Sequence, residues 1–187
     1  MFSEKMQLIY DKFFGIIFAV MKMDKEILEK ALKLIENVTP LNNDCGLLCG
    51  GACCKDNGEA GSGVWLLPGE EDIPHDWAET KTTKTPVTQT ELHMIYCRGM
   101  CERDKRPFLC RIFPLSPFFS EKKGCWSVRM DRRAAALCPL FSYGVRGLKP
   151  EFVEACREAV QLISEHPEGE ELLRILEKEE SAFRFEL

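Results

Sequence analysis

"CGLLCGGACC", residues 45–54, holds four of the ten cysteines and three of the thirteen glycines of this 187-residue chain. The spacing is Cys45-x3-Cys49-x3-Cys53-Cys54, so the stretch lacks the Cys-x2-Cys pair of a zinc ribbon. Glycines between the cysteines allow the backbone to turn tightly and to point N–H groups at sulfur atoms. Taken alone, the stretch permits a metal site, a disulfide knot, a redox switch or a chance clustering of small residues.

A second group of cysteines lies in "CRGMCERDKRPFLCRIFP", residues 97–114, with Cys97, Cys101 and Cys110. Five basic and two acidic residues between Cys97 and Arg111 give this segment a local balance of +3, although the whole chain carries -5. Groups far apart in sequence can converge, and a tetrahedral zinc site usually takes ligands from two short loops. The cationic segment can offset the negative charge of a thiolate cluster; the alternative is a solvated basic loop.

The combined motif resembles the zinc- or iron-chelating cysteine-cluster family, the YkgJ-like proteins. The resemblance covers about residues 41–140 and includes the turn "VWLLPGEE" after the first cysteine group. Family members commonly have Cys-x2-Cys-x2-Cys-Cys, whereas both gaps are one residue longer here. The matching residues are Cys45, Cys49, Cys53, Cys54, Cys101, Arg106-Pro107, Cys110-Arg111 and Phe113-Pro114.

The resemblance implies chelation of zinc or of an iron–sulfur cluster. A similar cluster occurs in flagellin lysine N-methylases, so an iron–sulfur enzyme, an oxidoreductase or a methylase, is one alternative, and a cysteine redox sensor is another. Cys156 falls on the apolar face of a predicted helix and is expected in the core. The candidate metal ligands are the other nine cysteines: Cys45, Cys49, Cys53, Cys54, Cys97, Cys101, Cys110, Cys125 and Cys138.

The predicted fold is α+β, mostly α, in a single domain spanning residues 1–187. Apolar spacings of three and four predict N-terminal helices within residues 1–40 and C-terminal helices over 150–187, with a break at His166-Pro167. The cysteine-rich, metal-binding middle, 41–140, is expected to be irregular, with short strands at 64–68 and 125–130. Residues 74–93 read as an exposed polar loop, Thr90 as the cap of a short helix, and Glu70-Glu71 as a helix start.

Composition sets limits on location and partners. A hydrophobic content of 45% and a charged content of 29% are typical of a globular protein with a core, and the acidic net charge argues against nucleic-acid binding. The uncharged run 13–21 is far shorter than the ~20 residues that span a bilayer. Without the features of a secretory signal, the chain is expected to be cytoplasmic, where dense cysteines more often bind metal or do redox chemistry. The apolar N-terminal helix is a candidate surface for a protein partner or a homodimer.

Overall fold

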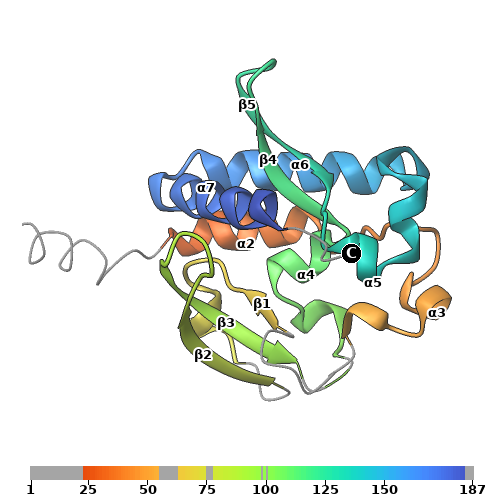
Figure 1. Ribbon diagram of the computed structural model, residues 1–187, viewed down its shortest axis with the longest axis horizontal. Coiled ribbons are helices and arrows are strands. Elements are labelled where there is room, and N and C mark those ends of the chain that lie inside the picture. The colour runs from red at the N-terminus through yellow and green to blue at the C-terminus, as the bar shows by residue number, and fades with distance from the viewer. Residues whose placement is uncertain (1–22, 55–62, 75–77, 98, 100, 184–187) are drawn as a thin grey trace, which may run out of the picture.

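A computed structural model describes residues 23–54, 63–74, 78–97, 99 and 101–183. Helices and two small antiparallel sheets make up an α+β fold (Figure 1). The expected helix before residue 23, together with the partner surface assigned to it, lies outside the described residues. The main helices are α2 (Lys25–Leu34), α3 (Gly46–Cys49), α4 (Phe108–Ile112), α5 (Ala134–Leu137), α6 (Pro150–Ser164) and α7 (Pro167–Ala182).

Three long helices, α2, α6 and α7, lie side by side across one half of the molecule (Figure 1). Asp24 begins α2 by accepting a hydrogen bond from the backbone N–H of Glu26 at 2.9 Å. Pro150 and Pro167 open α6 and α7, where the fixed φ of proline suits the first turn. The two predicted C-terminal helices and the break between them are therefore confirmed. Among the described helices, none has both the length and the apolar composition to cross a membrane.

The larger sheet has the order β1-β3-β2, with all pairs antiparallel. Its strands are β1 (Gly63–Trp65), β2 (Ala78–Lys84) and β3 (Glu91–Cys97). Trp65 pairs with Met94, and Ala78 pairs with Cys97. The second sheet is a hairpin of β4 (Leu115–Ser120) and β5 (Cys125–Met130). The predicted strand at 125–130 is confirmed, and the one at 64–68 is represented by β1.

Three predictions for the middle of the chain were wrong. The helix expected after Thr90 is strand β3, which is paired on both sides. The polar loop expected at 74–93 contains β2, an exposed edge strand whose β-branched threonines favour extended backbone. β4 lies in a segment that was expected to be irregular; its Pro117 pairs with Val128 in a two-stranded sheet, where proline is tolerated at the edge.

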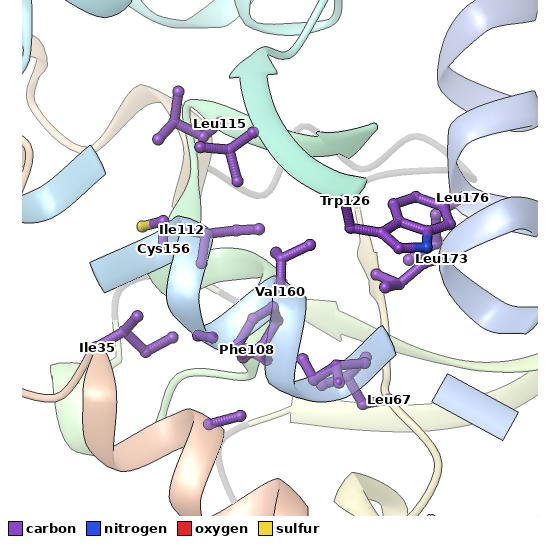
Figure 2. Close-up of a cluster of buried hydrophobic side chains, with 14 of the residues drawn as sticks. Ile35, Leu67, Phe108, Ile112, Leu115, Trp126, Cys156, Val160, Leu173 and Leu176 are labelled. Atoms are coloured by element: carbon purple, nitrogen blue, oxygen red, sulfur yellow. The ribbon is translucent and has the colours of Figure 1, made fainter. Parts of the chain in front are cut away.

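The core joins the helices to the sheets (Figure 2). Phe108 and Ile112 of α4 are fully buried and pack in the same cluster as Ile35, Leu67 and residues of α6 and α7. Cys156 is also fully buried in this cluster, which confirms its prediction as a core residue. Because Phe108 and Ile112 anchor both ends of α4, the core fixes the position of Cys110 between them.

Glu180 connects the end of α7 to β5 and to the turn after it. Its carboxylate is 1% exposed and lies against the guanidinium of Arg129. The other carboxylate oxygen accepts a hydrogen bond from the backbone N–H of Arg132 at 3.0 Å and lies 3.6 Å from the Nε of Arg132. Removing this carboxylate leaves a partly buried cation and a backbone donor without their acceptor.

Glu180→Ala is therefore expected to lower the free energy of unfolding by about 2–3 kcal/mol. Glu171→Ala is the matched control, because Glu171 is exposed on the same helix, and it should change stability by less than about 0.5 kcal/mol. Urea unfolding followed by circular dichroism measures both. Equal stability of the two variants would contradict the role given to Glu180.

Candidate metal centre

The first cysteine group folds into one short helix and a reversed turn. Asp44 starts α3 by accepting a hydrogen bond from the N–H of Gly46 at 3.0 Å. Cys45 and Cys49 are four residues apart, and the Sγ of Cys49 lies 3.7 Å from the carbonyl oxygen of Cys45, as expected for one helical turn. The next two residues, Gly50 and Gly51, have φ of 62° and 68°, a region that residues with side chains rarely adopt. The glycines therefore provide the turning that the sequence predicted, and Cys53 and Cys54 follow in a 3-10 turn.

Cysteines from three separate segments line one small cavity, about 30 Å³ in volume. Cys110 reaches it from α4, and Cys138 from the residue after α5. Both meet the first cysteine group, because α3, α4 and α5 lie on the same side of the molecule (Figure 1). The cysteines in the cavity wall are Cys45, Cys49, Cys53, Cys110 and Cys138, and Arg103 and Arg106 line it with them. Its volume suits an ion or a water molecule and is far below that of a pocket for an organic ligand.

Three further predicted ligands lie near Cys110. The thiols of Cys54, Cys97 and Cys101 each act electrostatically on the thiol of Cys110, which places all three near α4. Cys125 instead pairs with Ser120 at the turn of the β4–β5 hairpin, and this hairpin projects away from α3, α4 and α5 (Figure 1). The structure thus brings eight of the nine predicted ligands into one region and leaves Cys125 apart from it.

The eight thiols are neighbours and do not form a closed coordination shell. Across the described part of the chain, no three side chains of His, Cys, Asp or Glu stand close enough to one another to hold an ion as they are placed. The Sγ atoms of Cys53 and Cys54 are 3.8 Å apart. Two thiolates bound to one zinc ion at ~2.3 Å would be about as far apart, so the sulfurs of this one pair already stand at coordination spacing.

Burial and mutual repulsion control the acidity of the thiols. Burial is the main cause that raises the pKa of Cys45, Cys101, Cys110 and Cys138. The hydrogen bond between Cys53 and Cys54 raises the pKa of Cys53 and lowers that of Cys54 to about 6. A bound cation would reverse the repulsion, since thiols that coordinate a metal lose their protons.

Two arginines bring positive charge to the thiols. Arg103 donates a hydrogen bond to the carbonyl of Val38, and Arg106 donates one to the carbonyl of Cys101 at 3.3 Å. The Nε atoms of both arginines are buried and have no hydrogen-bond partner. A buried N–H without an acceptor is costly, and more so on a charged group. Thiolate sulfur can accept such a bond, so the donor set fits an anionic metal–thiolate centre.

The loop before α4 is fastened by Arg111 and Glu70. Arg111 donates from Nε to the carbonyl of Arg106 at 2.7 Å and from a terminal nitrogen to the carbonyl of Asp104 at 2.6 Å. Glu70 accepts hydrogen bonds from the N–H of Phe108 at 2.7 Å and from the N–H of Leu67 at 2.9 Å. Residues 70–72 do form a short 3-10 helix, but nothing in the sequence pattern predicted that the carboxylate of Glu70 would be buried against α4.

Comparisons with protein-family models, with curated proteins and with solved structures found no match.

Glu70 should make stability depend on pH. Its burial raises its pKa to about 7, so the folded protein keeps a proton that the unfolded chain releases above its usual pKa near 4.5. The stability linked to this proton is complete below pH 4.5 and is lost as the pH rises to 7, by about 2–3 kcal/mol between pH 5 and pH 8.

Urea unfolding of the wild type and of Glu70→Gln at pH 5 and pH 8 measures this contribution. The variant should be less stable at pH 5 by about 1–3 kcal/mol, because its amide nitrogen cannot accept a backbone hydrogen bond. It should also lose the Glu70 part of the pH dependence, while contributions from the thiols remain in both proteins. An identical change between pH 5 and pH 8 in both proteins would show that Glu70 does not titrate in this range.

Proposed function

We propose that this is a metal-binding protein that chelates zinc or an iron–sulfur cluster through its split cysteine cluster. The observation that carries the proposal is the cavity lined by cysteines from α3, from the turn after it, from α4 and from the end of α5. Three segments far apart in sequence present the same soft ligand to one space. Thiolates are the ligands that zinc and iron–sulfur clusters take in proteins.

Electrostatics supports a cation at this place. Cys45, Cys110 and Cys138 have raised pKa values partly because neighbouring thiols repel their negative charge. A divalent ion stabilises several thiolates at once, and the released protons pass to solvent. The buried N–H groups of Arg103 and Arg106 would donate to the metal-bound sulfurs.

The resemblance to the zinc- or iron-chelating cysteine-cluster family also supports this function. Its motif residues Cys45, Cys49, Cys53, Cys54, Cys101 and Cys110 all belong to the eight neighbouring thiols. A cytoplasmic location fits the proposal, since a reducing compartment keeps thiols available for metal. The metal would have a structural role, because metal–thiolate bonds would tie α3, α4 and α5 together.

A thiol redox sensor is the second candidate. The sulfur atoms of Cys53 and Cys54 are 3.8 Å apart, and the low pKa of Cys54, about 6, favours its reactive thiolate. The iron–sulfur enzyme stays an alternative within the first proposal, and it requires an open coordination position beside the cluster.

Protein purified without oxygen is expected to contain metal. Elemental analysis and an absorption spectrum identify it: broad absorption near 400 nm, as expected for cubane clusters, indicates iron–sulfur, and a colourless zinc protein indicates tetrahedral thiolate sites. Cys110→Ser should lose at least half of the bound metal. Cys125→Ser is the matched control and should keep all of it, because the β4–β5 hairpin holds Cys125 apart.

Folded protein without metal would contradict chelation. The same protein could then be tested for a reversible disulfide, seen as two thiols that stop reacting with a thiol reagent on mild oxidation and react again after reduction. That result would make the redox sensor the supported function in place of metal chelation. Metal loss in Cys125→Ser equal to that in Cys110→Ser would contradict the assignment of the eight neighbouring thiols.

A further inference from the structure

We propose that residues 184–187, which follow the last described residue, dock on an apolar surface at the cysteine cavity and shield it from water. This surface, called the leucine surface, consists of Leu47, Leu48 and Leu137. The segment reads "RFEL" and so offers two large apolar side chains. The inference goes beyond metal binding and does not depend on it.

The leucine surface is apolar and open to water. Leu47 is 83% exposed, Leu48 60% and Leu137 47%. Leu48 of α3 and Leu137 of α5 both line the cysteine cavity, so two elements far apart in the chain bring their leucines to one place. Exposed apolar side chains that gather in this way mark a docking surface, whereas single ones are common. Cys53, in the same cavity wall, is exposed, so this wall reaches the molecular surface.

The end of α7 lies close to the start of α5. A terminal nitrogen of Arg132 donates a hydrogen bond to the carbonyl of Ser181 at 3.2 Å, and the backbone N–H of Arg132 donates one to Glu180 at 3.0 Å. Leu137 follows Arg132 by five residues, and α5 makes up the last four of these positions. At a helical rise of about 1.5 Å per residue, this stretch is about 8 Å long.

The segment 184–187 is long enough to reach the leucine surface. α7 ends at Ala182, and the backbone of Phe183 is already extended, with φ of −60° and ψ of 127°. Four extended residues span up to about 13–14 Å. This length exceeds the stretch from Arg132 to Leu137, which leads from the end of α7 to the leucine surface.

The sequence of the segment also suits this surface. Side chains alternate between the two sides of an extended backbone. Phe185 and Leu187 therefore share one side, toward the leucine surface. Arg184 and Glu186 share the other side, toward water. Docking would remove apolar area of both partners from water, which is the main favourable contribution to such contacts.

The β2–β3 turn is the alternative place for the segment. Val87 in this turn is 51% exposed, and Glu179 of α7 accepts a hydrogen bond from its backbone N–H at 3.0 Å. Val87 offers one exposed apolar side chain, whereas the leucine surface offers three. The leucine surface is therefore the favoured place.

Photocrosslinking in the full chain tests the position of the segment. p-Benzoylphenylalanine takes the place of Phe185 and attaches on irradiation to nearby C–H groups, which mass spectrometry identifies. The crosslink is expected within one chain, at residues 45–49 or 134–143. Leu47→Asp should lower its yield about fivefold or more, because a carboxylate replaces an apolar contact. Val87→Asp is the matched control and should leave the yield unchanged.

Hydrogen exchange measures the shielding without a crosslinker. In Phe185→Ser, the amides of residues 45–49 and 134–143 should exchange several-fold faster than in the wild type, because water reaches α3 and α5 more often. Glu186→Ser is the matched control, because its side chain is placed on the side toward water. It should exchange like the wild type.

Several results would overturn the docking. One is a crosslink found only at other residues, above all in the β2–β3 turn, or no crosslink at all. Another is a crosslink between two chains, seen as a product of twice the mass, which would give the surface to a second copy. Equal yields in Leu47→Asp and Val87→Asp, or equal exchange in the two serine variants, would also overturn it. None of these results depends on whether the protein holds metal, so they leave the proposed function to its own test.

Discussion

The position of α4 is the constraint on which the cysteine region depends. This five-residue helix is too short to be stable alone, so its place is set by contacts made outside it. Phe108 and Ile112 are buried in the main core, and the carboxylate of Glu70 holds the first N–H of the helix. Those contacts also fix Cys110 and the loop before it, against which α3 and α5 present their own cysteines.

The cysteine region combines two unfavourable features, neighbouring thiols that repel one another when ionised and arginine N–H groups without acceptors. Several half-buried thiols lie near one another, so each one resists losing its proton while its neighbours lose theirs. Two guanidinium groups at the same place have buried N–H atoms without acceptors. Each feature is costly alone, and the binding of a cation, as proposed above, would relieve both by turning thiols into thiolates. This shared relief is the physical reason to connect the cysteines with metal.

Part of this arrangement was predictable from the sequence. The apolar spacing after residue 150 predicted α6, α7 and a core position for Cys156, because a helix with one apolar face has few alternatives. The sheet was harder: β3 carries His93 and Cys97 four residues apart, which also suits a helix, and only its pairing with β1 and β2 decides the structure. β2 is polar enough to resemble a loop, and its strand form depends on the same pairing.

The cysteine motif predicted which cysteines lie close together, but the sequence did not show that Cys125 lies apart from them. Cys125 has the same residue type as the rest, and only the direction of the β4–β5 hairpin separates it from them. The role of Glu70 was also hidden, since it depends on a contact 38 positions away along the chain. Spacing in the sequence indicates local geometry, whereas contacts between residues far apart in the chain depend on how the core packs.

Cys45 and Cys49 are separated by three residues, one more than in the Cys-x2-Cys gap common in the cysteine-cluster family. This longer gap is accompanied by apolar side chains exposed to water. With three residues between them, both cysteines take the inward face of a helix that has only one turn. The remaining positions of α3 must face water, and they hold Leu47 and Leu48, which are 83% and 60% exposed. Leucine side chains in water give up the hydrophobic free energy that they would gain in a core. α3 thus leaves its two leucines, the most water-exposed leucines of the described residues, outside the core, while its Cys49 lines the cavity.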